Sequence, residues 1–90
     1  MIKISSVEKL KAKFFKNPVA KDLKFNDAKK LLISYGCKLQ NNSGGSHYAV
    51  THINHSDTLI LPKHTVPLKR YNIKQIRDFI SDIENAEEEK

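Results

Sequence analysis

The chain has 90 residues, which limits it to one small domain with short tails. Hydrophobic residues make up 39% and charged residues 29%, a composition typical of a globular protein and not of a disordered one. A single cysteine excludes an internal disulfide, and no apolar run approaches the roughly 18 residues of a membrane span. We therefore expect a cytoplasmic domain without a membrane segment, stabilised by packing alone.

The formal net charge of +6 is unevenly distributed along the chain. Residues 1–77 carry 15 basic and 4 acidic side chains, a net charge of +11. Residues 78–90 carry 1 basic and 6 acidic side chains, a net charge of −5. A basic body favours a polyanionic partner, of which nucleic acid is the commonest. The alternative interpretation is a lysine-rich surface that is only solvated.

Two amphipathic helices are expected before residue 37. Ser5 and Glu8 form a capping box for the first helix, which should end before Pro18. Asn26 is expected to cap the second helix, and Gly36 to end it in the left-handed conformation. Each helix should contribute one apolar stripe to a common core: Val7, Leu10 and Phe14, then Ala28, Leu31, Leu32 and Tyr35.

The spacing of apolar residues then changes to two, which predicts short strands at 37–40, 46–53 and 58–61. Residues 41–45 form the strongest turn signal, and residues 54–57 a second, polar turn. Connections this short allow only antiparallel pairing, so we expect a three-stranded meander. Alternation in the second strand predicts two faces: Tyr48, Val50 and His52 on one, and His47, Ala49, Thr51 and Ile53 on the other.

A last helix is expected to start at Asn72, in a capping box with Gln75, and to end near Glu84. The resulting order, α-α-β-β-β-α, predicts an α+β fold in which helices cover one face of an antiparallel sheet. We expect residues 1–21 to form an N-terminal extension and residues 22–84 the main domain. The acidic tail, residues 85–90, is expected to be disordered.

The segment SGGSHY, residues 43–48, is the first candidate for chemistry. Its glycines, Gly45 among them, let the backbone approach a ligand closely, and Ser46 offers a hydroxyl where a phosphate could dock. His47 follows at the start of a strand, and the usual imidazole pKa of about 6.5 suits proton transfer at neutral pH. The alternative is a tight hairpin turn that only happens to precede a histidine.

A second candidate cluster follows the third strand, where Lys63 and His64 come directly after Pro62. In an antiparallel meander this point lies beside the start of the second strand, so both side chains should lie near His47. Lys69 and Arg70, in the next basic loop, should face the same ligand. These groups together could bind an RNA phosphate and cleave the backbone without a metal, although an ordinary basic loop is the alternative.

Other candidate residues are weaker. The histidines of the strands lack carboxylate or thiolate partners for a tetrahedral site, so no metal is expected. Cys37, just past a helix end, is expected to be a small buried hydrophobe and not a nucleophile. Tyr35, Tyr48 and Tyr71 could stack on nucleic-acid bases. Tyr35 and Tyr48 also suit the core.

Four segments, in this order and at this spacing, resemble the HicA toxins, which are mRNA interferases of type II toxin–antitoxin systems. The segments are AKKLLISYG (28–36), GSHY (45–48), LPKH (61–64) and IKQI (73–76). The resemblance covers roughly residues 22–83. It implies a double-stranded-RNA-binding-like α-β-β-β-α fold, to which residues 5–17 add a helix, and a metal-independent endoribonuclease that needs no cofactor.

The same resemblance implies roles for residues and partners. His47 matches the catalytic histidine of the family, with Gly45, Ser46 and Tyr48 beside it, and His64 matches a histidine after the third strand. The implied partners are an mRNA substrate and a HicB-like antitoxin protein that masks the active site, and the free toxin should be a monomer. Tyr48 stands where many members have a second histidine, and neither residues 1–21 nor the acidic tail belongs to the family pattern.

Two other classes of function stay open at this point. A non-catalytic RNA-binding module of the same fold would need the lysines but not His47. A DNA-binding protein is less favoured, because no helix-turn-helix pair with a basic recognition face is apparent.

Overall fold

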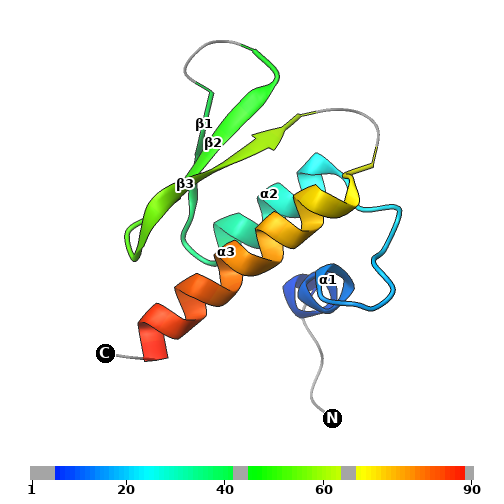
Figure 1. Cartoon of the computed structure of the whole chain (residues 1–90), viewed down its shortest axis with the longest axis horizontal. Coiled ribbons are helices and arrows are strands. Elements are labelled where there is room, and N and C mark those ends of the chain that lie inside the picture. The colour runs from blue at the N-terminus through cyan, green and yellow to red at the C-terminus, as the bar shows by residue number, and fades with distance from the viewer. Residues whose placement is uncertain (1–5, 42–44, 64–66, 89–90) are drawn as a thin grey trace.

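The computed structural model describes residues 6–41, 45–63 and 67–88. The elements along the chain are α1 (Ser6–Phe14), α2 (Phe25–Ser34), β1 (Lys38–Gln40), β2 (His47–His52), β3 (His55–Pro62) and α3 (Arg70–Glu88). The strands form one antiparallel sheet in the order β1-β2-β3, and α2 and α3 lie to one side of it, with α1 beyond them (Figure 1). The predicted α+β class and three-stranded antiparallel sheet are confirmed. No described helix is long and apolar enough to span a bilayer.

The core lies between the inner face of the sheet and the helices. Leu39, Val50 and Leu59 are aligned across the three strands, and the next pair on the same face is Tyr48 and Leu61. Tyr48 and Val50 therefore share one face of the strand, as predicted, and this face is the inner one. The largest fully buried side chains come from every helix, from two strands and from the segment before α2: Phe14, Leu23, Leu31, Leu32, Val50, Leu61, Ile73, Ile76, Ile80 and Ile83.

The N-terminal helix α1 shares this core. Phe14 at its end is fully buried, and Lys11 Nζ lies 2.7 Å from Glu84 Oε2 on α3. The chain then turns at Pro18, whose preceding peptide bond is cis. Ser5, the expected N-cap, lies outside the described residues.

The predicted N-cap of α2 is wrong. The cap is Lys24, whose backbone N–H donates to the carboxylate of Asp27 at 2.9 Å, so the helix begins before Asn26. The carboxylate at the third helical position satisfies the cap amide, and this lets Phe25 enter the core as the first helical residue. At the other end the prediction is confirmed, because Gly36 follows the helix with a φ of +85°.

The second predicted turn is also wrong. Residues 55–57 belong to β3, and the β2–β3 hairpin turns at Ile53 and Asn54, with His52 paired to His55. Further along, Val50 pairs with Leu59, so β3 holds extra residues in an irregular stretch between the two pairs. Most side chains of residues 55–57 are polar and exposed, so the sequence shows no alternation of apolar residues that would predict a strand here.

The last helix starts earlier and ends later than expected. Its first residue is Arg70, and Asn72 stands at the third helical position, where its Oδ1 accepts the backbone N–H of Lys69 at 3.1 Å. The predicted cap at Asn72 is thus wrong by one turn, although its side chain still closes the helix end. The helix continues to Glu88, so residues 85–88 of the tail that was expected to be disordered are helical. Alanine and glutamate, which form helices readily, extend the last turns beyond Glu84.

Candidate functional site

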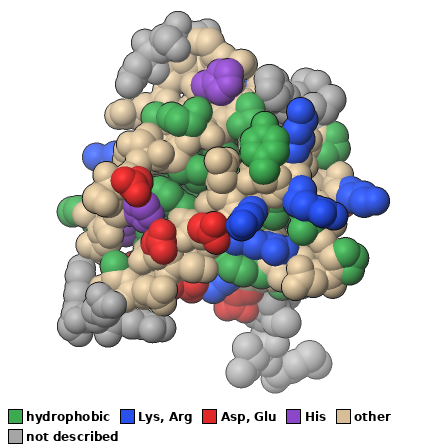
Figure 2. Space-filling model, viewed as in Figure 1, with side chains coloured by type: hydrophobic (Ala, Val, Ile, Leu, Met, Phe, Trp, Pro, Cys, Tyr) green, Lys and Arg blue, Asp and Glu red, His purple; other side chains and the backbone are tan. Residues whose placement is uncertain are grey.

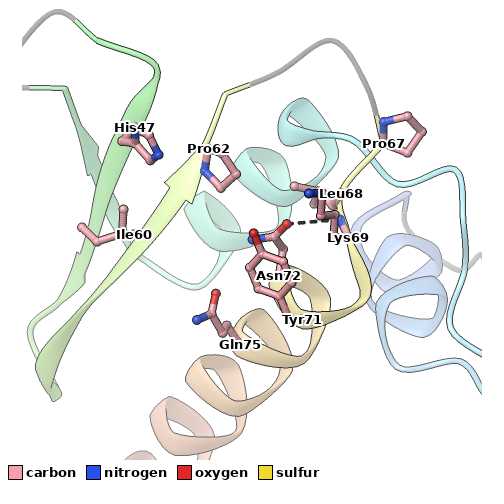
Figure 3. Close-up of a pocket in the computed structure, with 9 residues that line it drawn as sticks. All are labelled: His47, Ile60, Pro62, Pro67, Leu68, Lys69, Tyr71, Asn72 and Gln75. Atoms are coloured by element: carbon pink, nitrogen blue, oxygen red, sulfur yellow. Dashed lines mark hydrogen bonds between the residues drawn. The ribbon is translucent and has the colours of Figure 1, made fainter.

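A pocket of about 530 Å³ lies between the start of β2, the end of β3 and the first turns of α3. Figure 3 shows His47 pointing from β2 toward Pro62, while Tyr71 and Gln75 extend from α3 toward the sheet. The nine lining residues are His47, Ile60, Pro62, Pro67, Leu68, Lys69, Tyr71, Asn72 and Gln75. Two of the predicted site residues, His47 and Lys69, are therefore in the same pocket.

The position of His47 follows from the pairing of β2 with β3. His47 is the first residue of β2 and is aligned with Pro62, the last residue of β3. One step further out, the backbone N–H of Lys63 donates to the carbonyl oxygen of Ser46. The backbone of Lys63 therefore lies beside the start of the second strand as predicted, but its side chain does not line the pocket that contains His47. His64 lies outside the described residues.

The other two histidines of the hairpin have structural roles. His52 Nδ1 accepts the backbone N–H of Asn54 at 3.0 Å, so in the neutral ring Nε2 carries the proton and donates to the carbonyl oxygen of Tyr35 at 2.8 Å. His55 repeats the pattern on the other strand: Nδ1 accepts the N–H of Asp57, and Nε2 lies 3.1 Å from Asp82 Oδ2 on α3. The His52 ring thus connects the hairpin to the end of α2, and the His55 ring connects it to α3.

His47 differs from both of these rings. Within residues 6–41, 45–63 and 67–88, it is the histidine that has an exposed side chain and no hydrogen-bond partner. It lies at the opposite end of β2 from His52. No group of three or more metal-ligating side chains was found among the described residues. The imidazole of His47 is therefore available to a ligand.

Several predicted site residues lie outside the pocket. Ser46 and Gly45 are exposed beside His47, and the Gly45 carbonyl oxygen accepts a hydrogen bond from the Asn41 side chain. Tyr48 points to the opposite face, where its ring centroid lies 5.0 Å from that of Phe25. The Lys63 ammonium lies 5.7 Å from the centroid of the Tyr48 ring.

Arg70 is also separated from the pocket. It lines a smaller hollow with Val19, Ala20, Lys21 and Leu68 instead. Leu68 borders both cavities, so the two hollows are neighbours. Of the described basic residues predicted to face one ligand, Lys69 lines the pocket, Arg70 lines the neighbouring hollow, and Lys63 lines neither.

Sequence reasoning assigned no pocket role to Gln75 and gave Tyr71 only a weak one. The two residues are four apart on α3, so they lie on one face of the helix, outside the buried apolar stripe. A tyrosine and a glutamine four residues apart on a helix, directly after a basic loop, are the sequence signal that could have identified these two pocket residues. Their proximity to His47 depends on how α3 crosses β3, which local patterns do not determine.

The charges on α3 are arranged against the helix dipole. All basic side chains of this region precede its acidic side chains along the chain: Lys69, Arg70, Lys74 and Arg77. The first turn of α3 holds no acidic residue, and its last turn holds no basic residue. Helices are normally stabilised by the reverse arrangement, at about 0.3–1 kcal/mol for each charge. Figure 2 shows acidic side chains gathered over the C-terminal half of α3 and most Lys and Arg side chains on the other side of this face. The pocket thus lies at the positive end of α3, and none of its described lining residues is acidic.

Cys37 takes no part in this site. It is buried in the core at the start of the sheet, as expected, and burial raises the pKa of its thiol to about 11. A thiol in this state is a poor nucleophile at neutral pH.

The chain was compared with known proteins at three levels. No protein-family model, no curated protein and no solved structure matches it.

Proposed function

We propose that the protein is a metal-independent endoribonuclease and that His47 carries the proton in the cleavage step. The observation that supports this most directly is the free, exposed imidazole of His47 in a pocket whose described lining holds a lysine and no acid. Histidine is the side chain that most often transfers protons in general acid–base catalysis. The surrounding positive charge would attract the phosphodiester to it.

The phosphate would bind between Lys69 and the start of α3. The first backbone N–H groups of a helix lack intrahelical partners and lie at the positive end of its dipole. Here the first turn also carries Arg70 and no acidic residue, so nothing in that turn competes with a bound anion. This accounts for the charge order on α3, which lowers the intrinsic stability of the helix but suits an anion.

Cleavage would use the 2′-hydroxyl of the RNA itself. His47 removes the proton from this hydroxyl, and the 2′-oxygen attacks the neighbouring phosphorus. The bond from phosphorus to the 5′-oxygen breaks, and this oxygen takes a proton from solvent water, because the Lys63 ammonium lies over the Tyr48 ring and not in the pocket. His47 then returns its proton to solvent. The products are a 2′,3′-cyclic phosphate and a 5′-hydroxyl.

The motifs that resemble HicA toxins support a more specific version of this proposal. In that version the sheet and its helices have the double-stranded-RNA-binding-like topology, with α1 as an addition. The chain would be the toxin of a type II toxin–antitoxin system, cleaving mRNA in the cytoplasm and neutralised by a HicB-like antitoxin. In support, the GSHY segment leads into β2, and the LPKH segment begins at the end of β3. The two segments pair with each other in the sheet, His47 with Pro62.

The test is cleavage of a long end-labelled RNA by the purified chain, with EDTA present, beside His47→Ala. We expect 2′,3′-cyclic phosphate ends from the wild type and a loss of at least about 100-fold in rate for the variant, the usual size of a general acid–base contribution. Lys30→Ala, an exposed lysine on α2, is the control and should cleave normally. Equal rates for wild type and His47→Ala would reject the mechanism. RNA binding with no products would favour the non-catalytic RNA-binding module.

A further inference from the structure

The aromatic ring of Tyr71 is left exposed beside the proposed reactive group. Its side chain is 58% exposed, whereas Tyr35 and Tyr48 are packed against the core. Tyr71 lines the pocket that contains His47, and no hydrogen bond or ring contact occupies it within the described part of the chain. Large exposed aromatic rings in basic hollows are the platforms on which single-stranded nucleic acids stack their bases.

The walls around Tyr71 have the chemistry that a nucleobase requires. Ile60 and Pro62 of β3 supply apolar lining, and Gln75 projects from the same helix face as Tyr71 (Figure 3). The Gln75 side chain is exposed, so its amide offers both a donor and an acceptor to a base edge. Asn72, by contrast, is 3% exposed and its Oδ1 already binds the backbone N–H of Lys69.

The size of the pocket agrees with a small planar ligand attached to a phosphate. Its volume of about 530 Å³ falls in the range of roughly 300–1,000 Å³ found for small-molecule sites. Lys69 lines the same cavity directly before the first turn of α3, and its ammonium could bind a phosphate linked to the base. The pocket therefore has a flat aromatic surface, an amide and a cation within one cavity.

We propose that this pocket binds one unstacked base of single-stranded RNA, with the base on the Tyr71 ring and its edge on the Gln75 amide. The identity of the ligand as RNA rests on the proposed function, and the base subsite extends it. Bases inside a duplex are already stacked and paired, so a duplex cannot supply one without opening. The substrate class is thus single-stranded RNA, in contrast to duplex recognition by shape across the minor groove.

The test is binding of a short single-stranded RNA that carries 2-aminopurine and 2′-O-methyl groups, which block cleavage. Stacking on Tyr71 should quench the fluorescence of 2-aminopurine when the full chain binds. Tyr71→Ala should weaken binding by about 10- to 100-fold and remove the quenching, as expected for loss of one base-stacking contact. Tyr71→Phe should retain both. Ile33→Ala, which removes an exposed side chain from α2, is the matched control and should bind normally.

Two results would overturn the subsite: unchanged affinity in Tyr71→Ala, or equal affinity for the same sequence as a duplex. Because the probe cannot be cleaved, these results are independent of the chemical step. RNA cleavage that depends on His47 but not on Tyr71 would reject the subsite alone. Binding that depends on Tyr71, with no cleavage of unmodified RNA, would support the subsite and reject the ribonuclease.

Discussion

Arg77 on α3 donates a hydrogen bond from its Nε to the carbonyl oxygen of Phe14, the last residue of α1, at 2.5 Å. Its Nη2 donates to the carbonyl oxygen of Lys16, also at 2.5 Å. The last carbonyl groups of a helix have no partner within the helix, so the guanidinium closes α1 from outside. Since Phe14 is fully buried, this contact attaches the N-terminal helix to the body at the point where it enters the core.

We therefore predict that Arg77→Ala lowers the free energy of unfolding by about 1.5–3 kcal/mol, the range for hydrogen bonds to a charged group. Urea denaturation followed by circular dichroism measures this. Lys74→Ala is the control, because this lysine is exposed on the same helix, and we expect a change within about 0.5 kcal/mol. Equal stability of the two variants would show that α1 is held by Phe14 packing without the guanidinium.

Gly36 provides a second prediction, because its φ of +85° lies in the left-handed region. A Cβ atom there would meet His52 Nε2 at 3.7 Å, an ordinary contact, so the penalty comes from the backbone. Gly36→Ala should destabilise the protein by about 1–2 kcal/mol. Gly36→Asn should lose less, since asparagine tolerates this conformation. Thermal unfolding compares the two, and an alanine variant as stable as wild type would contradict the prediction.

The thiol of Cys37 should react slowly. Burial raises its pKa to about 11, so the thiolate fraction stays small at pH 8 and increases as the pH rises toward that value. We expect alkylation of the folded protein at pH 8 to be at least about 10-fold slower than that of a free cysteine, whose pKa is about 8.5. Addition of urea should restore the ordinary rate. Fast alkylation of the folded chain, measured by mass spectrometry, would contradict the burial of this side chain.

RNA affinity should depend on salt through Lys69. If Lys69 contacts a phosphate, Lys69→Ala weakens binding and reduces the slope of log K against log salt by about 0.7 for a single strand. Lys29→Ala, on the exposed face of α2, should leave the slope unchanged. Titrations between 50 and 200 mM salt, roughly the range over which such slopes are resolved, measure it. The same slope in both variants would place the phosphate away from the pocket.

Local sequence signals predicted the parts of the fold that local chemistry controls. The apolar stripe of α3, with Ile73, Ile76, Ile80 and Ile83 all buried, appears directly in the spacing of the residues. Gly36 at the end of α2 is another such case. The proximity of the end of β3 to the start of β2 followed from short connections, which permit only antiparallel neighbours, whereas the register that aligns His47 with Pro62 did not.

Features that depend on contacts between residues far apart in the sequence could not be predicted from local patterns. The caps of α2 and α3 were misplaced because several polar residues near each start could serve, and tertiary packing of Phe25 and Ile73 selects among them. The start of β3 was missed because His55 is held by Asp82, far along the chain. For the same reason the pocket could be predicted only in part: His47 was expected, whereas the place of Tyr71 depends on the path of α3.

The order of charges along α3 has a consequence for how fast the protein meets its ligand. The helix has 19 residues, so its basic and acidic ends are separated by about 28 Å at a rise of 1.5 Å per residue. In the field of an approaching polyanion such a molecule experiences a torque that turns the acidic end away and the pocket forward. A larger share of encounters then begins in a productive orientation, which raises the association rate constant at low ionic strength. Two proteins of the same net charge would differ in this rate if one of them had the order reversed.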